Sequence, residues 1–252
     1  RSDPDGTVSA AIESFGIDVR YINKIMHHKF MLIDAYRPGQ LTPQLGTLFT
    51  GSGNFSYSAG TRFDENTVII EGNADLVGHF AAEFALMWDN SRDFSYNTDV
   101  PAFTSAEVVD VSDLMDDERI EAVFTSDNFT LKETHYGPTF SVNRGLNTVA
   151  DRLVELINGA DESILVATGH LRSRSVSEAL IQKRIDRPDM DIRVYLDAHE
   201  YISEWYHYHQ VREREECLEE AGESESKRQD CMDRGFYYSY SAQESGVDVR
   251  FK

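Results

Sequence analysis

The feature that most constrains this chain is a short apolar run with polar side chains at fixed places around it. Residues 30–33 (Phe-Met-Leu-Ile) are bounded by polar residues, which predicts a strand over residues 25–33. His27 and Lys29 stand two positions apart just before the run. Because side chains alternate along a strand, we expect these two to emerge on one face, and Asp34, after the run, to have the opposite parity to His27.

A glycine-rich turn follows at residues 51–54 (Gly-Ser-Gly-Asn). An imidazole can attack phosphorus or shuttle a proton near neutral pH, so the His27 side chain suits phosphate chemistry. The ammonium group of Lys29 can neutralise phosphoryl oxygens in the transition state. Ser52 and Asn54 can add neutral donors to the same oxygens. Together these residues predict a site that handles a phosphate group.

This ordered set resembles the phospholipase D superfamily, whose signature is His-x-Lys-x4-Asp with a trailing Gly-Ser-x-Asn. Residues 63–70 resemble the acidic-Glu-Asn strand of that family, and residues 80–88 resemble its closing helix. The resemblance implies a phosphoric diester hydrolase that needs no cofactor and no metal. It also implies an α/β fold, a phospholipase D-like α-β-α sandwich of two pseudo-repeats, each with a mixed sheet flanked by helices. One departure is the insertion at residues 35–50, which is longer than in compact members.

The resemblance also implies roles for the motif residues. In the family, two His-Lys-Asp motifs meet at one site. One histidine forms a phosphohistidine, and the other protonates the leaving oxygen and then activates water. We choose His27 as the nucleophile, with Lys29, Ser52 and Asn54 binding the substrate phosphate.

Two acidic residues complete the predicted site. Asp34 belongs to the catalytic motif, but its parity favours holding the fold or orienting a partner histidine over touching phosphate. Glu65 is a candidate for a hydrogen bond to the motif histidine that fixes its tautomer.

An internal repeat suggests how the chain is organised. Residues 14–21 reappear as residues 244–251, an offset of 230 that would place a second motif histidine near position 257. We therefore expect residues 1–97 to be the motif-bearing half of a first repeat, 98–118 a linker, and 119–252 the opening half of a second repeat. The second His-Lys-Asp motif would come from a missing C-terminal segment or from a symmetry-related subunit.

Hydrophobic periodicity predicts alternating helices and strands, typical of an α/β sandwich. Expected helices cover residues 7–15, 73–90, 146–157 and 176–185, with a turn or short helix at 58–62. Expected strands cover residues 17–21, 66–71, 120–125, 163–168 and 192–197. His170 follows one of these strands, where α/β sites tend to lie, and is a candidate for the site wall.

Charge and cysteine content bear on partners and location. The net charge of −20 opposes strong non-specific binding to a polyanion, so nucleic acid is a less favoured partner. No run approaches the roughly 20 apolar residues of a membrane span. Cys217 and Cys231, the only cysteines, flank an acidic segment. We expect them to form a disulfide, which favours a secreted or periplasmic location.

Three functions remain open from the sequence. The favoured one is cleavage or transfer of a phospholipid headgroup. The first alternative is a nuclease of the same superfamily, and the second is a catalytically silent relative that binds partners or membrane.

Overall fold

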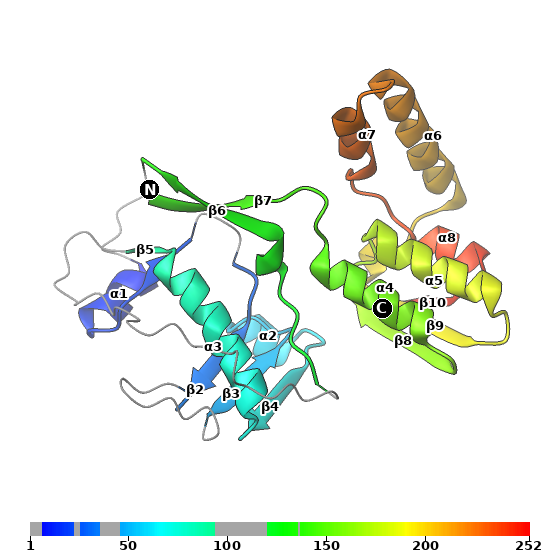
Figure 1. Cartoon of the computed structure of the whole chain (residues 1–252). Coiled ribbons are helices and arrows are strands. Elements are labelled where there is room, and N and C mark those ends of the chain that lie inside the picture. Colours follow the sequence, from blue (N-terminus) through cyan, green and yellow to red (C-terminus); the bar gives the residue numbers. More distant parts are fainter. Residues whose placement is uncertain (1–6, 23–25, 36–45, 94–119, 136) are drawn as a thin grey trace. The chain divides into compact units, whose positions relative to one another are not determined.

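The computed structural model describes residues 7–22, 26–35, 46–93, 120–135 and 137–252. Its contacts divide the chain into two compact units, residues 1–146 and 147–252, and each is described by itself (Figure 1). Both units combine helices with small sheets, so the predicted α/β class is confirmed. The linker predicted at 98–118 lies outside the described residues, and the predicted repeat boundaries stay a prediction.

The first unit is built around an antiparallel sheet with strand order β2-β3-β4. Its described elements are α1 (Val8–Ser14), β1 (Arg20–Tyr21), β2 (Phe30–Ile33), β3 (Thr47–Gly51), α2 (Tyr57–Thr61), β4 (Thr67–Glu71), α3 (Ala74–Asp89), β5 (Arg92–Asp93), η3 (Thr125–Asn128), β6 (Phe129–Thr134) and β7 (Gly137–Val142). The expected helices at 7–15 and 73–90 and the strand at 66–71 are thus present. β1 pairs with β5 and β6 pairs with β7, both antiparallel.

Helix α3 covers one face of this sheet (Figure 1). The side chain of Asn73 caps its first turn by accepting a hydrogen bond from the main-chain N–H of Leu76 at 3.0 Å. Leu48, which is fully buried in the middle strand, packs with Leu76 and Val77 of the helix. Burying such side chains contributes roughly 1.5–3 kcal/mol each, which holds the strands that carry the motif.

Three strand predictions in this unit need correction. The strand expected over 17–21 covers only Arg20–Tyr21. The motif strand was expected over 25–33, but β2 begins only at Phe30. Residues 120–125 are not a strand: 120–124 are irregular and lead into the short 3₁₀ helix η3. Their apolar side chains serve packing on α3 instead, because Ala122 contacts the core and the Phe124 ring lies 5.0 Å from that of Phe80.

The second unit contains a parallel sheet with strand order β10-β9-β8. Its elements are α4 (Thr148–Gly159), β8 (Ser163–Thr168), α5 (Arg174–Asp186), β9 (Asp191–Leu196), η4 (Ala198–Glu200), α6 (Glu204–Ala221), α7 (Glu225–Met232), α8 (Ser239–Glu244) and β10 (Asp248–Phe251). The expected helices and strands between residues 146 and 197 are confirmed. Side chains alternate between buried and exposed along β9, and the buried set (Ile192, Val194, Leu196) forms the core with residues of α5 and α8.

The predicted disulfide is present and joins α6 to α7. Cys217 and Cys231 are 5.8 Å apart between their Cα atoms, and Cys231 is buried. Within the described residues, no helix has both the length and the apolar character needed to cross a membrane.

The two copies of the internal repeat share backbone and side-chain detail. Gly16 follows α1 with φ +81°, and Gly246 follows α8 with φ +91°. This is the left-handed region, which glycine adopts without steric cost. In each copy an arginine then bonds the aspartate two residues before it: Arg20 Nε to Asp18 at 3.3 Å, and the Arg250 Nε atom to Asp248 at 3.2 Å.

Candidate functional site

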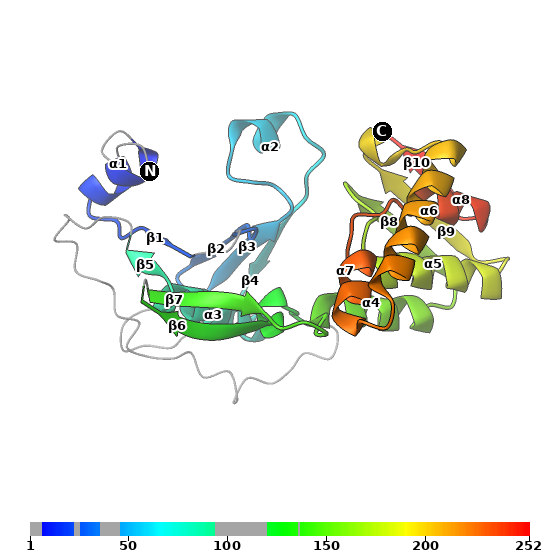
Figure 2. The same ribbon diagram turned by 90° about the horizontal axis from the view of Figure 1, so that it is seen from above.

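Three chain segments of the first unit converge at one end of the β2-β3-β4 sheet. Residues 27–29 lead into β2, residues 51–54 lead out of β3, and residues 65–66 lead into β4. The register pairs Phe30 of β2 with Thr50 of β3, and Gly51 of β3 with Thr67 of β4. The predicted site segments therefore come together because they flank neighbouring strands. Figure 2 shows α2 in the loop that leaves β3 and returns to β4. Residues 51–54 and 65–66 are the two ends of that loop.

The glycine-rich turn is held against β4 by a compact set of hydrogen bonds. The main-chain N–H of Ser52 donates to the carbonyl oxygen of Asn66 at 3.1 Å, and the main-chain N–H of Asn66 donates to the Ser52 hydroxyl at 3.0 Å. That hydroxyl donates in turn to Glu65 at 2.6 Å. Gly51 is required here because a Cβ atom would lie 2.1 Å from the Asn66 carbonyl oxygen.

His27 and Lys29 differ in exposure. The side chain of His27 is exposed, whereas Lys29 is only 9% exposed and its Nζ donates to the main-chain oxygen of His27 at 2.6 Å. The ammonium group is thereby fixed to the backbone of the motif histidine. In the described residues, the carboxylate of Glu65 bonds Ser52 and not the imidazole of His27, so the predicted tautomer-fixing contact is not formed in this structure.

Asp34 lies beyond the end of β2 with φ 54° and an exposed side chain. Aspartate tolerates this left-handed backbone better than most residues, since its short polar side chain can hydrogen-bond locally. The role predicted for Asp34, holding the fold or orienting a partner histidine, stays a prediction.

A polar network beneath His27 was missed by sequence reasoning. Nε2 of His28 lies 3.1 Å from Oε1 of the buried Glu83 on α3, and the hydroxyl of Ser126 donates to the other carboxylate oxygen at 2.7 Å. The His28 ring also packs edge-on against Phe30. His28 is thus part of the packing. Its partner Glu83 looks in the sequence like any polar residue of an amphipathic helix.

A cavity of about 350 Å³ adjoins this network. His27 and His28 form part of its wall. Most of the remaining wall is apolar, from Ile22, Met26, Leu86, Met87, Phe129 and Phe140. The motif histidine therefore borders a space suited to an apolar group.

In the second unit, His170 follows β8 as predicted, and its Nδ1 atom lies 2.8 Å from Glu200. Glu200 is fully buried and also binds Arg172. Sequence reasoning missed Glu200 as a partner because 30 residues separate it from His170.

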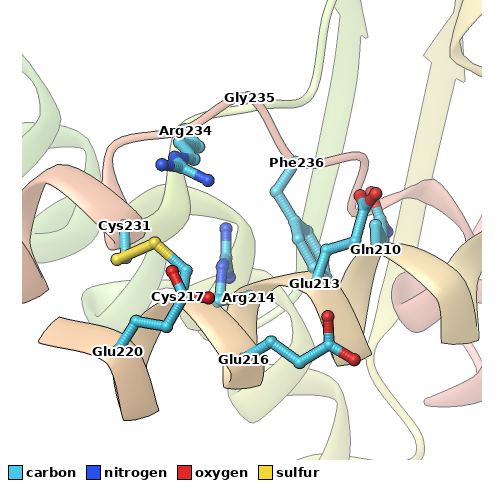
Figure 3. A pocket seen from close by; sticks show the side chains of 10 residues that line it. All are labelled: Gln210, Glu213, Arg214, Glu216, Cys217, Glu220, Cys231, Arg234, Gly235 and Phe236. Carbon is cyan, nitrogen blue, oxygen red and sulfur yellow. A yellow bond between two sulfur atoms is a disulfide. The ribbon is translucent and has the colours of Figure 1, made fainter.

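The second unit also has a polar hollow of about 340 Å³ beside the disulfide (Figure 3). The side chains of Arg214 and Arg234 border it together with Phe236 and both cysteines. The guanidinium of Arg214 lies 3.9 Å from the centre of the Phe236 ring and donates to the hydroxyl of Tyr238 at 3.3 Å. These contacts attach α6 to the segment after α7.

Comparison with protein families matched residues 5–88 to a family described as cardiolipin synthase, PLD-like domain. The match spans the predicted site residues from His27 to Glu65. Comparisons with curated proteins and with solved structures gave no match. The helices and small sheets are consistent with the α-β-α fold of that domain. Residues 5–88, a third of the chain, are therefore similar to a phospholipase D-like domain, and this match supports the resemblance to the phospholipase D superfamily.

Proposed function

We propose that this chain is a phospholipase D-type phosphodiesterase that hydrolyses or transfers a phospholipid headgroup through a phosphohistidine on His27. Nε2 or Nδ1 of the imidazole attacks phosphorus; the bond from phosphorus to the leaving alkoxide breaks, and that oxygen takes up a proton. Water or an alcohol then displaces the histidine and regenerates it. Lys29, Ser52 and Asn54 would neutralise or bind the phosphoryl oxygens.

The observation that carries the choice of a lipid is the apolar cavity bordered by His27. A phosphodiester with an alkyl substituent can bury that substituent while its phosphorus lies near the imidazole. A nucleic acid offers no such group next to its phosphate, and the net charge of −20 opposes a long polyanion.

The family match at residues 5–88 and the left-handed glycines at equivalent places of the repeated segments, Gly16 and Gly246, support a two-repeat enzyme. The second His-Lys-Asp motif is then supplied by further chain or by a second subunit. The disulfide supports a secreted or periplasmic location, because such bonds persist in oxidising compartments.

The first test is His27→Ala, with the exposed His135→Ala as the matched control. Turnover of a generic phosphodiester such as bis(p-nitrophenyl) phosphate should be lost in the first variant and kept in the second. An acid-labile phosphohistidine should be trapped on residue 27 by rapid quench and mass spectrometry. Equal turnover by both variants would exclude His27 as the nucleophile. No turnover by the unaltered chain would favour the alternative that the protein is a catalytically silent relative.

The second test is a series of alkyl p-nitrophenyl phosphates of increasing chain length. Each methylene that enters the cavity should raise kcat/KM roughly fourfold, because burying a CH₂ group is worth about 0.8 kcal/mol. Met87→Glu should flatten this dependence by placing a charge in the cavity wall. A flat series in the unaltered chain, with efficient cleavage of single-stranded DNA, would favour the nuclease instead.

A further inference from the structure

His170 and Arg172 lie where parallel sheets commonly build binding sites. β8 and β9 are parallel, and their registered last residues are Thr168 and Leu196. His170 follows the first strand by two residues, and Glu200 follows the second by four. Ligands of open α/β sheets bind outside the carboxyl ends of the strands.

Glu200 organises this strand-end cluster from inside. It is 0% exposed, and its Oε1 atom accepts hydrogen bonds from His170 Nδ1 at 2.8 Å and from Arg172 Nε at 2.8 Å. Oε2 accepts from the main-chain N–H of Leu171 at 3.3 Å, and the hydroxyl of Ser239 donates to the main-chain oxygen of Glu200 at 2.5 Å. Burial alone would raise the pKa of this carboxyl, but the hydrogen bonds from Arg172 and His170 outweigh it and leave the pKa lowered. The glutamate is therefore a fixed anion.

The orientation of His170 follows from that charge. A carboxylate can only accept, so the His170 ring carries a proton on Nδ1 and directs Nε2 away from Glu200. The His170 side chain is 66% exposed, and no partner of its Nε2 is found in the described residues. Arg172 is held on two sides, by Glu200 and by the Tyr237 ring 4.4 Å away, and its side chain remains 38% exposed.

A second imidazole is held in the same way in η4, which follows the neighbouring strand β9. His199 is 89% exposed, and its Nδ1 lies 2.6 Å from Oδ1 of Asp197. Hydrogen bonds from His199 lower the pKa of Asp197, and the charge of His170 adds to the effect. The most deeply buried group of the cluster is thus the Glu200 carboxylate. The side chains of His170, Arg172 and His199 reach solvent, and so does that of Asp197.

A purely structural role does not account for the histidine. The main-chain N–H of Leu171 and the guanidinium of Arg172 already bond the buried carboxylate. Fixing a ring that is mostly exposed adds little buried area, but it fixes the direction in which Nε2 points. Groups fixed by an inner shell of hydrogen bonds are typical of sites that bind a ligand.

We propose that His170 and Arg172, with His199 beside them, form an oxyanion site for a phosphoryl group, and that Glu200 is its positioning residue. The ligand class is inorganic phosphate or a phosphate monoester. Guanidinium and protonated imidazole groups both donate charge-assisted hydrogen bonds to phosphate oxygens. The site lies wholly in residues 147–252 and goes beyond the proposed chemistry of His27.

The test uses the full chain with His27→Ala, so that phosphate bound at the motif histidine does not contribute. Inorganic phosphate is titrated while histidine side chains are followed by NMR. The resonances of His170 and His199 should shift saturably. The apparent Kd, read from His170 in Arg172→Gln and from His199 in His170→Asn, should rise at least tenfold in each variant. Arg212→Gln is the matched control, since it removes the same charge from a surface pair with Glu216.

Several outcomes would overturn the proposal. These are no saturable shift of His170, equal shifts of His170 and the α6 residue His209, or unchanged affinity in both site variants. Glu200→Gln should weaken binding as well; if that variant does not fold, Glu200→Asp, which keeps the charge but shortens its reach, replaces it. A lower Kd for glycerol 3-phosphate than for inorganic phosphate would identify a site for phosphate monoesters. Equal Kd values would identify a site for free phosphate.

Discussion

Removing the disulfide should measurably destabilise the second unit. Cys217 and Cys231 are separated by 14 positions, so the bond closes a short loop through the turn between α6 and α7. In the chain-entropy model, a loop of this size contributes about 3 kcal/mol by restricting the unfolded chain. Cys217→Ala combined with Cys231→Ala should lower the free energy of unfolding by that amount, plus up to about 1 kcal/mol for the cavity left at the buried Cys231.

The chain offers a clean optical assay for this effect. Its two tryptophans lie in different units, Trp88 in α3 and Trp205 in α6. In a Trp88→Phe background, fluorescence during urea unfolding reports the helix that carries Cys217. Thiol reduction of that same background provides the control, because it opens the loop without deleting atoms.

The loss of unfolding free energy in the double alanine variant and the loss after thiol reduction should differ by no more than about 1 kcal/mol, which is the cavity contribution. A loss below about 1 kcal/mol in both would refute the loop-entropy reasoning, since the closed loop should contribute about 3 kcal/mol. It would mean that the α6–α7 hairpin keeps its structure when the rest of the unit unfolds. A large loss only in the alanine variant would assign the effect to packing at Cys231.

Three further changes test the packing and the strand ends. Glu200→Gln should cost about 1–3 kcal/mol at pH 7, because it weakens the buried hydrogen bonds of this side chain while Arg172, which is 38% exposed, can still be solvated. The pKa of Glu200 in the folded chain lies below the ordinary 4.5, so its contribution to the free energy of unfolding is present above pH 4.5 and is lost as pH falls through the folded pKa. In acid titrations followed by fluorescence, the variant should therefore lose stability less steeply than the unaltered chain. Leu48→Ala should cost about 2–5 kcal/mol in thermal unfolding, and the half-exposed Met31→Ala much less; equal costs would contradict the assigned core. Gly51→Ala should displace the start of β4 and lower the phosphodiesterase kcat/KM, because the added Cβ atom would lie 2.1 Å from the carbonyl oxygen of Asn66. An unchanged kcat/KM would show that the turn tolerates a Cβ atom.

The sequence alone determined the α/β class, most helices and strands, the motif and the disulfide. Each of these depends on short-range information. The period of apolar residues indicates helix or strand. The motif is recognised from the sequence spacing of its residues, His27, Lys29, Ser52 and Asn54, without knowledge of their spatial neighbours. The pairing of Cys217 with Cys231 needed no more than their being the only two cysteines.

Tertiary structure decided where strand pairing begins and which distant residues become partners. The largely apolar segment 120–124 matched a strand in composition, yet it is irregular in the structure and packs on α3 through Ala122 and Phe124. Glu83 and Glu200 looked like other acidic residues of a chain with 44 of them, and only folding buried each against a histidine. Sequence periodicity specifies which side of an element faces inward, but the partner across a gap of 30 or 55 residues is fixed by how the elements pack.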